Sequence, residues 1–371
     1  MRILYLITGL GVGGAETQVF ALCERLSALG HSVMLVSLTD AAPGFATGNG
    51  FRVHTLGLNK HVTSAAVTYF RLRQLTRAFA ADVVHSHMFH ANVFARALRL
   101  STPLPRLICS AHSTNEGGAA RMLAYRLTDR LSDLNTNVSA AGVHAFVRHK
   151  ASHSNKIVAM RNGIDTTRFA FNAVARREVR RKLELLPDQK MILAVGRLVP
   201  AKDYPNLLQA LAAVCRHRED VHLIIAGEGS ERASLQALAR QLSIVSRVTF
   251  LGLRHDIPKL MSSADVFVLS SAWEGFGLVV GEAMACERVV VATDCGGVRE
   301  IVGDSKLLVP PHDPPALATA LHQALDLGKH EAHALGEAAR KRIERTFSLD
   351  QVVQDWLRLY QTPHRRSRNN H

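Results

Sequence analysis

Short apolar runs alternate with amphipathic stretches along the whole chain, and this alternation constrains the fold more than any other feature of the sequence. The apolar runs are typical of strands that are buried on both faces, and the stretches between them are typical of amphipathic helices. A chain of this kind forms parallel sheets that are covered by helices. At 371 residues the chain exceeds what one hydrophobic core usually supports. We therefore expect an α/β protein of two domains.

In the N-terminal half, helices are expected at Ala15–Leu29, Val67–Ala80 and Ala119–Ser132. Strands are expected at Ile3–Thr8, Ser32–Leu38, Arg52–Leu56, Val83–Ser86, Arg106–Ser110, Leu134–Val138 and Lys156–Met160. The turn-rich segment Arg161–Asp165 and the highly charged segment Ala175–Glu184 then interrupt the pattern. We place the domain boundary here, with residues 1–168 as an N-terminal domain.

The alternation then restarts, with residues 169–348 as a C-terminal domain. Strands are expected at Met191–Val195, His222–Ala226, Val248–Leu251, Val266–Leu269, Val289–Ala292 and Lys306–Val309. Helices are expected at Tyr204–Arg216, Ser230–Leu242, Leu278–Cys286 and Pro315–Leu325, followed by a helical tail at Ala332–Thr346 and Leu349–Gln361. Two Rossmann-like sheets in tandem should face each other across a deep cleft that receives the carboxyl ends of the strands. Residues 363–371 are polar and basic and are expected to be disordered.

The composition places the protein among soluble globular proteins, with 47% hydrophobic and 20% charged residues. No apolar run approaches the roughly 20 residues that cross a bilayer. The short N-terminal apolar run is interrupted by glycines, so we interpret it as a buried strand and not as a signal peptide. The five cysteines form no CxxC pair, which favours reduced thiols in a cytoplasmic protein.

The positive charge is concentrated in the first half of the chain. Residues 1–170 hold 18 lysines and arginines against 8 acidic residues, a net charge of +10, whereas residues 171–371 carry +4. A basic half indicates an anionic partner, either a phosphorylated substrate or an acidic membrane surface. No nucleic-acid-binding pattern is present, so we expect no nucleic-acid partner.

The segment Gly9–Gly14 follows the first expected strand and satisfies the pattern GxGxxG. Asp40 closes the second strand, where a dehydrogenase places its ribose-binding acid, so an NAD-dependent dehydrogenase is one hypothesis. A tight turn would also explain the glycines. Gly14 opens a helix whose free amides can bind a phosphate, without indicating which phosphate.

A stronger signal lies in the segment Glu274–Ala285, directly after the expected strand Val266–Leu269. Glycines between its two glutamates expose backbone amides at a helix start, where a sugar hydroxyl or a diphosphate oxygen could bind. Glu282 should point from this helix into the cleft, where a carboxylate can accept two hydrogen bonds from the ribose hydroxyls. The alternative is a solvated helix residue, but its neighbours are apolar, which would make an unpaired carboxylate costly.

Two cations accompany the glutamates. Arg197 ends the first strand of the second half, and Lys202 follows in the next loop. A diphosphate needs such a pair of charges, each contact contributing roughly 1.5–3 kcal/mol. Two solvated surface cations are the alternative.

In this order, the motifs of the chain resemble those of the family 4 retaining glycosyltransferases of GT-B fold. The similarity runs from Gly9 to Phe347, and Arg299 departs from it because proline is frequent at that position. The motifs are Gly13-Gly14-Ala15-Glu16, Asn162-Gly163-Ile164-Asp165, Gly196-Arg197-Leu198 with Lys202, Ala226-Gly227-Glu228-Gly229, Glu274-x7-Glu282 and Gly296-Gly297-x-x-Glu300.

The resemblance implies a role for each matching residue. Arg197 and Lys202 match the residues that hold the donor phosphates, Glu282 the ribose-binding glutamate and Glu274 the one beside the transferred sugar. His112 matches the active-site histidine near the donor sugar, with His85 and His87 as competing candidates. Gly14 would approach the diphosphate from the N-terminal domain, and the returning helix 349–362 would belong to that domain. Donor-binding amides are implied around Phe276, Gly277, Leu278 and Val279.

The resemblance also implies transfer from a nucleotide-diphosphate sugar, such as a UDP- or GDP-sugar, with retention and without a metal ion or other cofactor. Glu274 could be a covalent nucleophile or could act electrostatically. The implied acceptor is a saccharide or polyprenyl-linked sugar in bacterial cell-surface polysaccharide or glycolipid synthesis. The arginines of Val67–Ala80 and Ala119–Ser132 could place a cytoplasmic protein on the inner face of the membrane. A GT-B-shaped sugar-nucleotide epimerase and a non-catalytic nucleotide-binding protein remain as alternatives beside the dehydrogenase.

Overall fold

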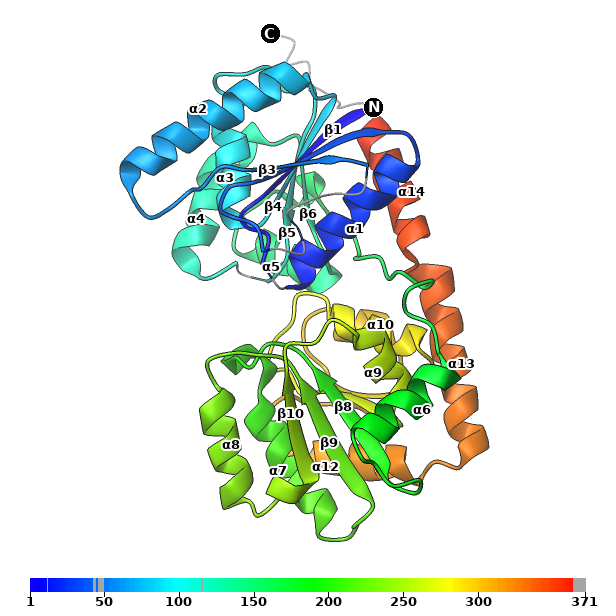
Figure 1. Cartoon of the computed structure of the whole chain (residues 1–371). Helices are drawn as coiled ribbons and strands as arrows, with labels where there is room; N and C mark the ends of the chain where they lie inside the picture. Colours follow the sequence, from blue (N-terminus) through cyan, green and yellow to red (C-terminus); the bar gives the residue numbers. More distant parts are fainter. Residues whose placement is uncertain (12, 43–44, 46–49, 115, 363–371) are drawn as a thin grey trace. The chain divides into compact units, whose positions relative to one another are not determined.

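The computed structural model describes residues 1–11, 13–42, 45, 50–114 and 116–362 (Figure 1). The chain divides into two compact units, one of residues 1–163 with the chain from Leu349 onward, and one of Ile164–Ser348. Ile164 enters the second unit because it forms an isolated parallel bridge with Ser348 and its amide donates to the carbonyl of Phe347 at 2.8 Å. The division thus falls a few residues before the boundary placed after Arg168. The basic tail 363–371 lies outside the described residues.

The first unit is built on a parallel sheet with the strand order β3-β2-β1-β4-β5-β6-β7. The strands are β1 (Arg2–Ile7), β2 (Ser32–Ser37), β3 (Arg52–Thr55), β4 (Val83–His87), β5 (Leu107–Ala111), β6 (Leu134–Asn137) and β7 (Ile157–Ala159). Its helices are α1 (Gly14–Ala28), α2 (Val62–Phe79), α3 (Phe89–Leu98), α4 (Ala119–Thr128), α5 (Ala140–Arg148) and α14 (Leu349–Gln361). Each strand expected in this half is present, with ends that differ by a residue or two.

Both faces of this sheet are covered, as the alternation along β1 shows. Ile3, Tyr5 and Ile7 belong to an apolar cluster with α1 and α14, which lie side by side in Figure 1. Leu4 and Leu6 point to the opposite face and pack with α2 and α3. The strand is therefore buried on both sides, which explains its continuous apolar sequence.

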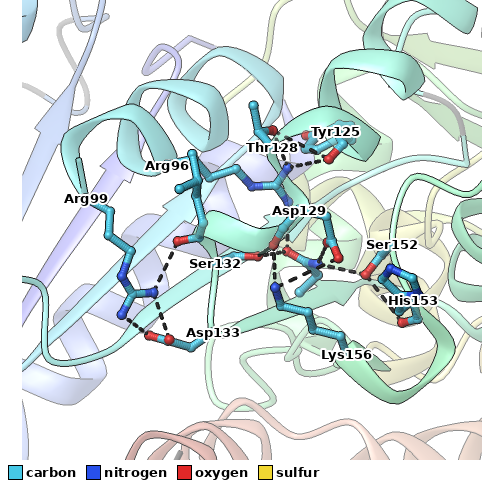
Figure 2. A network of polar contacts seen from close by, with 12 residues as sticks. Arg96, Arg99, Tyr125, Thr128, Asp129, Ser132, Asp133, Ser152, His153 and Lys156 are labelled. Carbon is cyan, nitrogen blue, oxygen red and sulfur yellow. Dashed lines mark hydrogen bonds and ion pairs between the residues drawn. The ribbon is translucent and has the colours of Figure 1, made fainter. Parts of the chain in front are cut away.

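A buried polar network closes the amino-terminal edge of β5, β6 and β7 (Figure 2). Arg96 of α3 donates to Asn135 Oδ1 at 2.8 Å, and Arg99 pairs with Asp133 at 2.7 Å. Asp133 directly precedes β6, and Lys156, which directly precedes β7, also belongs to the network. Because these residues lie where strands begin, they fix the edge opposite to the one that receives ligands in open α/β sheets.

The second unit contains another parallel sheet, with the strand order β10-β9-β8-β11-β12-β13. The strands are β8 (Lys190–Val195), β9 (Val221–Ala226), β10 (Val248–Gly252), β11 (Val266–Leu269), β12 (Val289–Thr293) and β13 (Leu308–Val309). The helices are α6 (Ala173–Lys182), α7 (Tyr204–Cys215), α8 (Arg232–Gln241), α9 (Ile257–Ser263), α10 (Leu278–Ala285), α11 (Val298–Val302), α12 (Pro314–Asp326) and α13 (Lys329–Thr346). The core lies between the sheet and helices α7, α8 and α12.

Several helices were not expected from the sequence. The charged segment 175–184 is mostly helix α6, whose Arg176 and Arg180 pair with Asp265 at 2.6 and 3.0 Å. Helices α3, α5, α9 and α11 were also missed, and the predicted helix Ala119–Ser132 ends at Thr128, followed by a short 3-10 turn at Asp129–Leu131. The predicted class, two parallel sheets each covered by helices, is confirmed.

Candidate functional site

Four neighbouring strands of the second sheet, in the order β9-β8-β11-β12, end at one edge, and the candidate residues follow them. Arg197 and Lys202 follow β8, and Glu274 follows β11. Helix α10 begins shortly after Glu274 and carries Glu282. Parallel strands bring their carboxyl ends to the same edge, so residues far apart in the sequence meet there.

The glycines of two motifs hold the loops of this edge together. A Cβ at Gly227 would lie 1.9 Å from the carbonyl oxygen of Gly196, and one at Gly229 would lie 2.2 Å from that of Leu198. Gly296, at φ +57°, comes as close to the carbonyl oxygen of Glu274, where a Cβ would lie at 1.9 Å. These glycines therefore allow neighbouring loops to support the backbone that carries Arg197 and Glu274.

Lys202 and Glu274 form an ion pair between the ends of β8 and β11. Ser271 donates its hydroxyl to the same oxygen of Glu274 at 2.7 Å, and Ser270 donates to the carbonyl of Lys202 at 2.9 Å. Thr293, at the end of β12, donates to the carbonyl of Ser271 at 2.6 Å. A lysine and a carboxylate are thus fixed beside each other by three strand ends.

Arg197 is exposed, and its guanidinium forms no hydrogen bond or ion pair with the rest of the described chain. Its backbone, by contrast, is held on both sides, because Gly196 donates to the carbonyl of Ala226 at 3.0 Å and Leu198 to that of Glu228 at 2.9 Å. A free cation on a fixed loop is available to an anionic ligand.

The start of α10 presents backbone amides. Gly277 precedes the helix with φ +92°, a left-handed conformation that favours glycine. Phe276 is buried, with its ring centroid 5.9 Å from that of Phe347, whereas Leu278 and Val279 remain partly exposed. The first amides of a helix have no intrahelical acceptor and attract negative charge.

Glu282 is buried in α10, with only 8% of its surface exposed. Burial raises the pKa of its carboxyl to about 7, and the nearby Arg168 acts in the opposite direction. Its carboxylate forms no hydrogen bond or ion pair with another described residue. Glu282 is therefore not a solvated helix residue. A buried acid without a partner is costly unless a ligand engages it.

In the first unit, Gly14 is the first residue of α1 and lies after the carboxyl end of β1. Gly13 precedes it in an extended conformation, and a Cβ there would lie 2.5 Å from the carboxylate of Glu16. The helix start is thus at the edge where the glycine motif predicted it. Val12 of that motif lies outside the described residues.

His112 follows β5 at the same edge of the first sheet. Its Nε2 lies 3.0 Å from Nδ1 of His87, and its backbone amide donates to Oε1 of Glu116 at 2.7 Å. His87 and His85 are both buried on β4. Burial lowers the pKa of His112 to about 4 although its side chain remains partly accessible, so the ring is neutral at pH 7.

Two further residues, Ser271 and Arg168, shape these sites but were not predicted from the sequence. No motif distinguishes Ser271 from the other serines of the chain, although its position three residues before Glu274 places it in the same loop. Arg168 follows Asp165, whose side chain accepts from the Arg168 amide at 2.9 Å, and this turn motif could have drawn attention to it. The contact between His87 and His112 could not be read from spacing alone.

Among the described residues, no group of three or more histidine, cysteine, aspartate or glutamate side chains could hold a metal ion. In the same part of the chain, no helix combines the length and the apolar character that crossing a bilayer requires.

Two family models match this chain. The model described as Glycosyltransferase Family 4 matches residues 12–168, and the model described as Glycosyl transferases group 1 matches residues 175–342. An uncharacterized glycosyltransferase of Methanocaldococcus jannaschii is 27% identical over 94% of both chains. A glycogen synthase of Mycobacterium tuberculosis is 28% identical over 94% of this chain and 91% of its own.

Solved structures agree in fold. A crystal structure of Anabaena HepE in complex with UDP-glucose is similar with a TM-score of 0.86 at 21% identity, over 97% of this chain and 99% of that chain. Two Rossmann-like units with these neighbours define the GT-B fold. With the two models spanning most of its length, the chain belongs to the family 4, group 1 glycosyltransferases.

Proposed function

We propose that this glycosyltransferase takes its sugar from a nucleotide-diphosphate donor that the second unit binds at the carboxyl edge of its sheet. The observation that carries the proposal is the buried, unpartnered carboxylate of Glu282, on helix α10, which begins shortly after Glu274 of the Lys202–Glu274 pair. Glu282 would accept hydrogen bonds from the ribose hydroxyls. The bound UDP-glucose in the HepE structure is in keeping with such a donor.

The diphosphate would be held by Arg197, Lys202 and the amides from Phe276 to Val279. Charge that develops on the leaving phosphate then meets fixed positive groups, so that catalysis is mainly electrostatic and uses the chain's own cations in place of a metal ion. Glu274 would lie beside the transferred sugar. From the first unit, the family resemblance assigns Gly14 to the diphosphate and His112 to the sugar.

We propose transfer with retention of the anomeric configuration to a saccharide or polyprenyl-linked acceptor, in bacterial cell-surface polysaccharide or glycolipid synthesis. The family supports retention. The basic first unit favours an anionic acceptor. Thermal-shift measurements with UDP, GDP, ADP and NAD test the donor, because a ligand that binds the native state raises the melting temperature by mass action. We expect a nucleoside diphosphate to stabilise the protein. Stabilisation by NAD alone would favour a dehydrogenase.

Product analysis with the matching nucleotide sugar then separates the remaining alternatives. A glycosyltransferase consumes the donor with an acceptor and releases the nucleoside diphosphate, whereas an epimerase changes the sugar without an acceptor. A non-catalytic protein would bind the nucleotide and give no turnover. Activity that persists in EDTA is the expected result for chemistry without a metal ion.

We further place the protein in the cytoplasm, on the inner face of the membrane. Helices α2 and α4 both contact α3, and both expose large apolar side chains next to arginines. On α4, Leu123 is 53% and Leu127 75% exposed, and the exposed Arg126 shares this helix face. The exposed Arg130 follows in the 3-10 turn after the helix. On α2, Phe70 is 63% exposed. Apolar residues flanked by cations suit an anionic leaflet, where each basic residue contributes about 1 kcal/mol.

Co-sedimentation with vesicles tests this surface. Binding to vesicles that contain phosphatidylglycerol should exceed binding to phosphatidylcholine vesicles, and the double variant Leu123→Glu/Leu127→Glu should lose it. Leu186→Glu is a matched control, because Leu186 is 68% exposed in the second unit. Equal binding to the two types of vesicle would exclude this surface as the docking site. Binding of the double variant at the native level would exclude it as well.

A further inference from the structure

Three histidines lie in contact at the carboxyl edge of the first sheet. His85 and His87 are two residues apart on β4 and point to the same face, with ring centroids 4.0 Å apart. His112 follows the neighbouring strand β5, and its Nε2 lies 3.0 Å from Nδ1 of His87. The proposed function uses only His112.

His85 is fully partnered. Its Nδ1 lies 2.7 Å from the hydroxyl of Tyr360 on α14, and its Nε2 lies 2.7 Å from the hydroxyl of Ser110. The Tyr360 hydroxyl also lies 2.7 Å from that of Tyr5. These bonds satisfy both ring nitrogens of the buried His85, and they also attach the last helix to the sheet.

His87 differs because only one of its ring nitrogens has a partner. Nδ1 contacts His112, whereas Nε2 is buried without a hydrogen-bond partner among the described residues. Burial lowers the pKa of His87 well below its ordinary value, so the ring is neutral and carries a single proton. Buried N–H groups without an acceptor are rarer than acceptors without a donor. The proton therefore belongs on Nδ1, where it is donated to His112.

This assignment fixes the tautomer of His112. If Nε2 of His112 accepts the bond from His87, its own proton lies on Nδ1. That nitrogen forms no hydrogen bond with another described residue, and the ring is partly accessible. We propose that His87 is a positioning residue that holds His112 as the Nδ1–H tautomer, so that His112 donates a hydrogen bond to a hydroxyl or phosphate oxygen of the sugar nucleotide. The contact of His112 with a sugar nucleotide rests on the proposed function, but the tautomer of His112 does not.

Nuclear magnetic resonance of the full chain with ring-¹⁵N-labelled histidine tests the tautomer directly. The protonated and bare nitrogens of a neutral imidazole have well-separated shifts, and the signals of His112 are assigned by their loss in His112→Gln. We expect a proton on Nδ1 of His112 in the native protein. A proton on Nε2 of His112 in the native protein would overturn the inference, and this result requires no variant of His87.

Variants then test the role of His87. His87→Phe should move the His112 proton to Nε2 and lower turnover of the sugar donor about tenfold, whereas His87→Asn should restore both, because its amide can donate from about the same position. His144→Phe, at an exposed position of α5, is the control that should change neither. An unchanged His112 tautomer in a folded His87→Phe would contradict the role of His87. Correct tautomers without any binding of UDP or GDP would instead contradict only the proposed function.

Discussion

Lys202 and Glu274 are 72 residues apart in the sequence, yet their side chains form an ion pair between two strand ends of the second sheet. Ser271 donates to the same carboxylate at 2.7 Å, so Glu274 has two donors from the chain itself. The charge of Lys202 is therefore balanced by a carboxylate of the chain itself. In our proposal, the donor diphosphate shares or replaces this contact.

Replacing Glu274 by glutamine removes the negative charge beside Lys202. UDP should then bind about tenfold more tightly, equivalent to about 1.4 kcal/mol, because the lysine no longer exchanges a carboxylate for the diphosphate. Turnover should fall, since Glu274 lies beside the transferred sugar in our proposal. Titration calorimetry and donor turnover measure both effects. Glu337→Gln, which breaks an exposed pair with Lys341, is the control. Weaker UDP binding in Glu274→Gln would contradict the exchange.

Lys202→Ala should lower turnover roughly 10²–10³-fold, because it removes a fixed positive charge from the developing charge of the leaving diphosphate. It also leaves Glu274 without its ionic partner at the same edge. Steady-state kinetics with the donor identified by thermal shift provide the measurement. Arg254→Ala serves as a comparison, since Arg254 is exposed and pairs with Asp256 in the loop after β10. Turnover equal to that of the native enzyme would exclude a role of Lys202 at the leaving diphosphate.

Glu282→Gln should change how stability depends on pH. Burial raises the pKa of Glu282 from 4.5 to about 7, so the folded state holds this proton more tightly than the unfolded state. The stabilising contribution is complete below about pH 4.5 and is lost as the pH rises through 7. At pH 8 the variant should therefore be more stable than the native protein by up to about 3 kcal/mol, with little difference at pH 4. Urea unfolding at both pH values measures this, with the exposed Glu178→Gln as control.

Nucleotide binding should release a proton from the same group. In our proposal the ribose hydroxyls donate to the ionised carboxylate, so UDP affinity should rise as the pH increases from 6 to 8. Calorimetric titrations in buffers of different ionisation enthalpy count the released protons. The effect should vanish in Glu282→Gln. Affinity that falls over this range in the native protein would mean that Glu282 is not the group that the nucleotide engages.

Gly296→Ala should distort the loop that carries Glu274. Its Cβ would lie 1.9 Å from the Glu274 carbonyl oxygen, and the residue has φ +57°. Gly57→Ala is a matched control, because Gly57 has φ +67° with nothing within 4 Å of the added atom. Both variants carry backbone strain of about 1–2 kcal/mol, but only Gly296→Ala adds the clash. Donor turnover should fall in Gly296→Ala alone, and equal loss in both would indicate strain without any effect on the site.

Much of the fold follows from hydrophobic periodicity, and the exceptions have physical causes. Strand β11 matches its predicted range because its four residues are all buried and apolar. Helix α3 was missed because its buried face includes Asn92 and Arg96, which are satisfied by tertiary hydrogen bonds. Helix α11 has five residues, too few to show a helical period.

Some features of the candidate site could likewise be predicted from the sequence, whereas others could not. The motif identified Glu282, and its apolar neighbours correctly indicated burial, because helix α10 is covered on nearly all sides. The pairing of Lys202 with Glu274 and the contact between His87 and His112 are long-range contacts, which only the strand order brings together. Such contacts depend on the tertiary structure and not on local sequence.

A crystal structure of the full chain with UDP would show whether Glu282 binds the ribose. We expect both ribose hydroxyls within hydrogen-bonding distance of the Glu282 carboxylate, about 2.6–3.2 Å, and the diphosphate in contact with Arg197 and Lys202. A nucleotide bound elsewhere, or a ribose that does not touch Glu282, would contradict this expectation.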